Sequence, residues 1–128
     1  MEASALLDAH VQLKRIYTAL NEALDLTRQL AEAVDRDDEV TVQMVLAMRQ
    51  EPIERIARAY EALEEQRLSL NGDDAARLSE LINGEAERTP EEARLAKQAG
   101  LNQRVLRQIV DLDKVVNRKL ARDKSIYN

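Results

Sequence analysis

The chain has 128 residues and a formal net charge of −5, and 45% of its residues are apolar although only 2% are aromatic. Strands favour β-branched and aromatic residues and need glycine-rich turns, so this composition excludes a β-sandwich, a β-barrel and a doubly wound α/β enzyme. The lack of cysteine excludes disulfides, thiolate zinc sites and thiol nucleophiles, and a single histidine excludes nearly every metal site built on imidazole. We therefore expect an all-α protein, an antiparallel bundle of long helices with coiled-coil-like packing that forms one domain over residues 1–128.

The first predicted helix covers residues 3–35. Its apolar side recurs at alternating steps of three and four residues, which is the spacing of a bundle or coiled-coil seam. The seam positions are Leu6, His10, Leu13, Tyr17, Leu20, Leu24, Thr27, Ala31 and Val34, and Ala9, Ile16, Ala23 and Leu30 widen the seam on one flank. A seam of this width is typical of a helix that packs against more than one neighbour.

The second predicted helix covers residues 38–70. Asp37 is its expected N-cap, and the acidic residues that follow suit the positive end of a helix. Because the connection is short, we expect the first two helices to form an antiparallel hairpin. Pro52 lies inside the pattern and removes one backbone hydrogen bond, so we expect a kink or a break over residues 49–52.

Two further helices are predicted, a short one over residues 74–83 and a long C-terminal one over residues 90–122. Gly72 is expected to follow the second helix in the left-handed conformation. The long helix starts at Thr89-Pro90-Glu91-Glu92, which combines an N-cap, a proline at the first helical position and a capping-box glutamate. Gly100 is a candidate interruption of its first third.

Charge divides the chain unevenly. Residues 1–94 carry a formal charge of −10, whereas residues 95–128 carry +5. In one interpretation, the basic last helix docks on the acidic hairpin. In another, its outer face binds an acidic partner, a phosphate backbone or a membrane surface.

The apolar residues of the last helix fall into two predicted stripes. One stripe consists of Leu95, Leu106, Ile109 and Leu120, and the other of Leu101, Val105, Leu112 and Val116. One stripe would cover the hairpin of the same chain. The other would bind a second copy of the chain or an amphipathic segment of another protein, unless the short helix over residues 75–82 folds back and covers it.

His10 is the only residue suited to proton or phosphoryl chemistry near neutral pH. The string around it is similar to that of histidine phosphotransfer domains, which are small helical bundles with a lysine beside the histidine. It departs from that family because Lys14 is four residues on and Arg15 stands where a glycine would follow. A structural histidine at the edge of the seam is the alternative.

No other motif supports catalysis or a cofactor. Inward-facing Glu-x-x-His pairs, which di-metal bundles use, are missing from the sequence, so we interpret Glu61, Glu64, Glu65, Asp111 and Asp113 as parts of solvated helix faces. The sequence also has no glycine-rich phosphate loop and no H-E-x-x-H string. We therefore expect a protein that is not an enzyme and has no cofactor.

Nucleic acid and membranes are unfavoured partners. The chain is acidic overall and offers few aromatic side chains for base stacking or for a membrane anchor. No apolar run approaches the roughly 20 residues of a membrane span, and Met1-Glu2-Ala3 lacks the positive start of a secretory signal. We expect a cytoplasmic protein without membrane insertion.

An acidic turn is followed by a helix that reads Asp38-Glu39-Val40 through Met44-Val45-Leu46-Ala47-Met48-Arg49-Gln50 and Ile53-Glu54-Arg55-Ile56. The last helix is punctuated by asparagines, with Asn102, Leu106, Ile109 and Asn117. In these features the chain resembles the small flagellar export chaperones of the FlgN/FliT kind. Pro52 and the connection over residues 71–92 depart from the family pattern.

The resemblance implies a non-enzymatic chaperone that holds an amphipathic C-terminal segment of a hook-filament junction or cap subunit and prevents premature assembly. By this reasoning Leu101, Val105, Leu112 and Val116 would bind the cargo, Arg104, Lys119 and Arg122 would select its charge, and Ile126 and Tyr127 would extend the contact. The competing hypothesis is a coiled-coil adaptor or self-assembling homodimer without cargo, and phosphotransfer through His10 is a third hypothesis.

Overall fold

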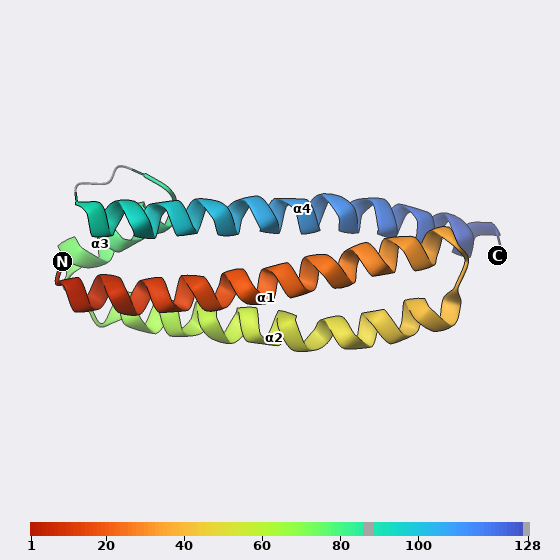
Figure 1. The fold of residues 1–128 in the computed structure, drawn as a ribbon, viewed down its shortest axis with the longest axis horizontal. Coiled ribbons are helices and arrows are strands. Elements are labelled where there is room, and N and C mark those ends of the chain that lie inside the picture. Colours follow the sequence, from red (N-terminus) through yellow and green to blue (C-terminus); the bar gives the residue numbers. More distant parts are fainter. Residues whose placement is uncertain (86–88, 127–128) are drawn as a thin grey trace.

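The computed structural model describes residues 1–85 and 89–126 and confirms the all-α bundle. Its helices are α1 (Ala3–Asp35), α2 (Glu39–Leu68), α3 (Gly72–Ile82) and α4 (Pro90–Ile126) (Figure 1). No strand occurs in these described ranges. Relative to the expected bounds, α2 is shorter by one residue at its start and two at its end, α3 begins two residues earlier, and α4 continues four residues further.

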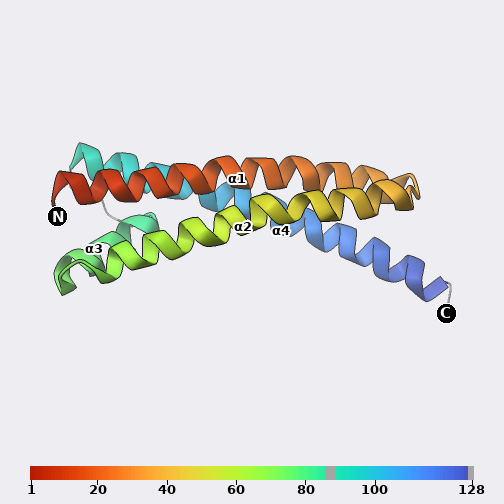
Figure 2. The ribbon, with the colours of Figure 1, turned by 90° about the horizontal axis from the view of Figure 1, so that it is seen from below.

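The long helix α1 is the centre of the bundle. It packs against both α2 and α4, and α2 runs antiparallel to it while α4 runs in the same direction as α1 (Figure 1). In the ranges described, no Cα atom of α2 lies within 8 Å of one in α4. The short helix α3 lies at one end of the bundle, where it contacts α2 and α4 (Figure 2).

The start of α2 differs by one residue from the expected cap. Asp38, and not Asp37, is the N-cap, because its Oδ1 accepts a hydrogen bond from the backbone N of Thr41 at 3.1 Å. The Thr41 hydroxyl donates to Asp38 Oδ2 at 2.6 Å, and these two hydrogen bonds hold the pKa of the Asp38 carboxyl below its usual value. Asp37 takes a positive φ of 55° and makes the turn between the helices. Several adjacent acidic residues suit a helix start equally well, so the sequence did not single out Asp38.

At the ends of α3 and α4, the prediction for Gly72 is wrong and the prediction for Thr89 is confirmed. Gly72 is the first residue of α3 and not a left-handed terminator of α2, since Asn71 Oδ1 caps α3 by accepting from the backbone N of Asp74 at 2.9 Å. The glycine with a positive φ is Gly84, at 78°, just after α3. The Thr89 cap is confirmed, because its hydroxyl oxygen accepts from the backbone N of Glu92 at 3.1 Å.

Neither expected interruption breaks its helix. The helix α2 is continuous through Pro52, whose side chain is buried, and α4 is continuous through Gly100. A proline removes one backbone hydrogen bond from a helix, whereas the packing of a long helix on its neighbour involves its whole length. The packing against α1 therefore offsets the local cost at Pro52.

The buried apolar side chains form two clusters. The larger one draws on all four helices and contains Leu6, Ala9, Leu13, Ile16, Leu20, Ala23, Leu24, Ala59, Leu63, Leu78, Leu81, Leu95, Ala96, Ala99 and Ile109. The smaller one lies towards the turn between α1 and α2 and contains Leu30, Ala33, Val34, Val42, Val45 and Val116. The absence of α3 at that end explains why the second cluster is smaller.

Four residues at seven-residue spacing form the side of α4 that packs against α1. They are Leu95, Asn102, Ile109 and Val116, and all of them are buried. The polar member, Asn102, donates from Nδ2 to the backbone oxygen of Leu13 at 2.8 Å and accepts from Gln98 Nε2 at 3.0 Å. A buried amide with both groups paired fixes the register of the two helices.

An ion pair links α3 to α4. Arg77 Nε donates to Glu92 Oε2 at 2.7 Å, and both side chains are largely buried. This hydrogen bond holds the pKa of the Glu92 carboxyl below its usual value. The pair anchors the middle of α3 against the first turn of α4.

Glu92→Gln is expected to lower the stability at neutral pH, because Arg77 loses its anionic partner. A carboxyl whose pKa is depressed by folding stabilises the fold above its unfolded-state pKa, and this stabilisation is lost as the pH falls through the folded-state pKa. The difference in stability between Glu92→Gln and the native chain should therefore shrink as the pH falls below about 4. Thermal unfolding at pH 7 and pH 3 measures this, with the exposed Glu91→Gln as control. A deficit of the same size at both pH values would contradict the role of the Glu92 charge.

Candidate protein-binding surface

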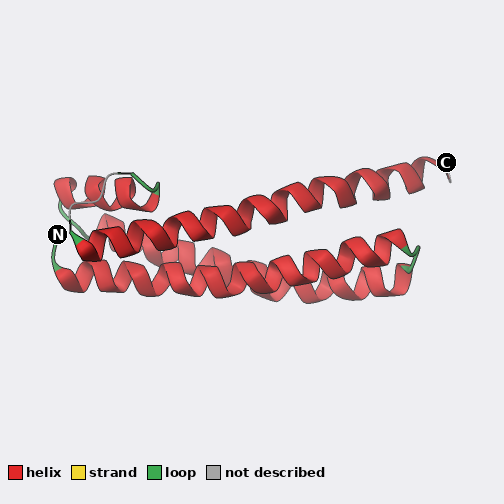
Figure 3. Ribbon diagram, turned by 45° about the horizontal axis from the view of Figure 1, so that its top comes forward, coloured by secondary structure: helices red, strands yellow, loops and turns green. Residues whose placement is uncertain are grey.

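The short helix α3 covers only one part of the space between α2 and α4. At its C-terminal end, the backbone oxygen of Ile82 accepts from Gln103 Nε2 at 3.2 Å. Beyond Gln103, α4 continues to Ile126 without α3 beside it (Figure 3). The sides of α2 and α4 that face each other past this point are the first place to look for a binding surface.

One ion pair identifies these facing sides. Arg49 Nη1 of α2 lies 2.6 Å from Asp113 Oδ1 of α4. The same nitrogen donates to Thr27 Oγ1 of α1 at 3.1 Å, so Arg49 joins all three long helices. Residues three, four, seven or eleven positions from Arg49 or Asp113 lie on the same side of their helix.

Four apolar residues occupy those positions and are exposed. Ile53 and Tyr60 follow Arg49 by four and eleven residues, and Val110 and Leu106 precede Asp113 by three and seven. Their exposed fractions are 42% for Ile53, Tyr60 and Val110 and 41% for Leu106. The part of Tyr60 that is covered raises the pKa of its hydroxyl by desolvation. We call these four residues the α2/α4 strip; it continues the path of α3 along the bundle.

Asp113→Ala is expected to destabilise the bundle by about 1–2 kcal/mol, because it leaves the partly buried Arg49 guanidinium without its carboxylate. Urea denaturation measures the change in the free energy of unfolding. The control is Asp111→Ala, two residues earlier on the same helix. It removes the same charge from an exposed position and should change stability far less. Equal losses in the two variants would contradict a structural role of the Arg49 to Asp113 pair.

The residues expected to bind cargo lie in several different environments. Leu101, Val105 and Leu112 are half-buried, and Val105 packs against the larger core cluster. Val116 is only 1% exposed and belongs to the smaller cluster. Arg104 and Arg122 are exposed, whereas Lys119 forms an ion pair with Asp35 of α1. Tyr127 and the Ile126 side chain lie outside the part of the chain that the structure describes.

The expected division of α4 into two stripes is therefore wrong at Val116 and Leu106. Val116 was expected on the outer stripe but is core, and Leu106 was expected inward but is exposed. Leu95 and Ile109 are buried as expected, and Leu120 packs against the smaller cluster. The reason is that the side facing α1 follows a seven-residue repeat whose second member is Asn102, which an assignment by apolar residues alone leaves out.

His10 lies at the edge of the packed surface of α1 and is partly exposed. Burial lowers the pKa of its imidazole, and the charges of Lys14 and Arg94 lower it further. Among the residues with a described placement, no group of three or more His, Asp or Glu side chains could hold a metal ion. No described helix is both long and apolar enough to cross a membrane.

The α2/α4 strip is thus a set of exposed apolar residues on the sides of α2 and α4 that carry the Arg49 to Asp113 pair. Its apolar side chains are suited to contact with another protein segment, since the charged side chains of Arg49 and Asp113 beside them pair with each other. Compared with protein-family models, curated proteins and solved structures, the chain matches none of them.

Proposed function

We propose that the protein is a non-enzymatic, cytoplasmic export chaperone that binds an amphipathic helix along the α2/α4 strip. The helix would be the C-terminal segment of a flagellar hook-filament junction or cap subunit, as the resemblance to the FlgN/FliT kind of chaperone implies. The observation that carries the proposal is the exposure of Ile53, Tyr60, Leu106 and Val110 on facing sides of two helices. Bound there, the segment would be kept from assembling before export.

The short helix α3 indicates what kind of segment fits. It is an amphipathic helix of 11 residues that contacts α2 and α4 at the start of the same path, with Leu78 and Leu81 fully buried. Further along that path the corresponding apolar side chains of α2 and α4 are exposed. An amphipathic helix that continues the line of α3 would cover them in the same way.

Charge favours a cargo helix with an acidic flank. Arg107 and Lys114 are exposed and lie next to Leu106 and Val110 along α4. The segment from residue 95 onwards is also the basic part of an otherwise acidic chain. Basic side chains beside an apolar strip increase the association rate of an acidic partner and disfavour a basic one.

The test is fluorescence anisotropy with labelled synthetic C-terminal helices of a hook-filament junction subunit and of a cap subunit. We expect saturable binding by at least one of them and none by matched peptides whose apolar face carries serine. If neither native peptide binds, while sedimentation shows a tight dimer that protects the strip, the coiled-coil adaptor is the better description. Acid-labile phosphate on His10, lost in His10→Ala, would instead support phosphotransfer.

A further inference from the structure

A hollow of about 830 Å³ lies between α1 and α2, away from the strip residues. It is lined by Leu7, His10, Val11, Gln12, Lys14, Arg15 and Thr18 of α1 and by Arg55, Arg58, Ala59 and Ala62 of α2. None of the four residues of the α2/α4 strip contributes to it. The hollow is therefore a second surface, separate from the α2/α4 strip.

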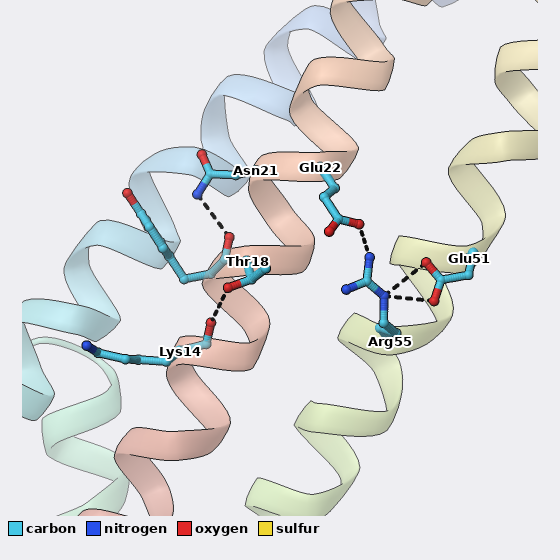
Figure 4. Close-up of polar contacts among 7 residues, drawn as sticks. Lys14, Thr18, Asn21, Glu22, Glu51 and Arg55 are labelled. Carbon is cyan, nitrogen blue, oxygen red and sulfur yellow. Dashed lines mark hydrogen bonds and ion pairs between the residues drawn. The ribbon is translucent and has the colours of Figure 1, made fainter.

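The charged residues that line the hollow are all basic. Arg55 is already neutralised, since its Nη2 pairs with Glu22 of α1 and its Nε lies 2.8 Å from Glu51 (Figure 4). Figure 4 also shows the Lys14 side chain extending away from both carboxylates. Within the described ranges, the structure shows no ion pair for Lys14, Arg15 or Arg58, so three cations of an acidic chain stay without an anion here.

The lining also contains apolar side chains, next to the polar His10, Gln12 and Thr18. Leu7 is 63% exposed and Val11 40%, and Ala59 and Ala62 lie across from them on α2. Apolar side chains between two helices, with unpaired cations beside them, match a ligand that is itself apolar on one side and anionic on the other. A small inorganic anion would leave the apolar part uncovered, and a flat bilayer surface would not follow a hollow between two helices.

We propose that this hollow binds an acidic amphipathic segment of a partner protein, independently of the α2/α4 strip. Apolar side chains of the segment would cover Leu7 and Val11, while its carboxylates would pair with Lys14, Arg15 and Arg58. A protein that binds cargo on one side would thereby have a separate site for a second protein.

The experiment uses two labelled helical peptides of about 18 residues, or five turns. Both carry leucines at helical spacing, one with glutamates and the other with lysines on the flanks. Fluorescence anisotropy is measured with the native chain, with the double variant R15E/R58E, and with the control K97E/R118E, which changes the net charge equally at two exposed positions of α4. We expect the acidic peptide to bind, to bind about tenfold more weakly to R15E/R58E, and to bind the control almost as well as the native chain.

Other readouts separate this site from its alternatives. Because the strip is a different surface, the acidic peptide should still bind to L106E/V110E. That remaining binding should be lost when R15E/R58E is added. Equal binding of the acidic and lysine peptides, or equal losses in R15E/R58E and its control, would overturn the proposal. So would binding to phosphatidylserine vesicles that depends on Arg15 and Arg58 when the acidic peptide does not bind. Circular dichroism confirms that each variant keeps its helical content.

Discussion

Glutamate at both Leu106 and Val110 is expected to weaken the binding of an amphipathic cargo helix on the order of a hundredfold. Covering a large aliphatic side chain contributes about 1.5–3 kcal/mol when it is complete, and these two are already partly covered in the free protein. The variant loses that remaining gain and must also desolvate two carboxylates. Together these costs amount to about 3 kcal/mol, which corresponds to the expected change in Kd.

The matched control for this experiment lies on the same helix. Val115 is 42% exposed, as Val110 is, but it is five residues further on and points to a different side of α4. The single variants V110E and V115E therefore introduce the same charge at the same exposure, and only V110E should weaken binding of the labelled peptide. Equal effects would show that the strip is not the binding surface.

Asn102→Ala is expected to destabilise the bundle by about 2–3 kcal/mol. Asn102 is 4% exposed, and its amide pairs with the Leu13 backbone oxygen and the Gln98 side chain, which is also buried. Alanine leaves the Gln98 amide without its acceptor and opens a small cavity between α1 and α4. Urea denaturation followed by circular dichroism measures the free energy of unfolding.

Asn117→Ala is the control for that variant, because Asn117 is exposed on the same helix. Its stability should stay within about 0.5 kcal/mol of the native chain. If both variants have the same free energy of unfolding, the buried amide does not hold α4 on α1. The effect of Asn102→Asp provides a second check, since a carboxylate facing the Leu13 oxygen should destabilise more at neutral than at acidic pH.

The helices and most of their ends follow from local sequence patterns. The three-and-four spacing of apolar residues gave α1 with its observed bounds, and Thr89 before Pro90 marked the start of α4. These signals depend on residues that are close in sequence, so they are readable without a structure. The predicted N-cap of α2 differs from the observed one by one residue, because neighbouring aspartates have nearly equal capping preferences.

The sides of the helices were harder to predict than the helices themselves. The side of α4 that packs on α1 includes a buried asparagine, Asn102, whose amide is hydrogen-bonded to the Leu13 backbone oxygen. A prediction based on apolar residues alone does not include a polar residue at such a position. The strip depends on where α3 ends between α2 and α4, a contact between segments far apart in sequence. For this reason the apolar pattern places Leu106 inward and Ile53 and Tyr60 on the buried side of the second helix, although the structure exposes all three.

The limited length of α3 makes the two ends of the bundle unequal in local stability. One end has buried side chains from four helices, and the other has six buried side chains from three. Segments with fewer buried contacts open more often without global unfolding. Backbone amides in the second half of α4 should thus exchange with solvent faster than those near Leu95, and a helix bound along the strip would slow that exchange by supplying the missing neighbour.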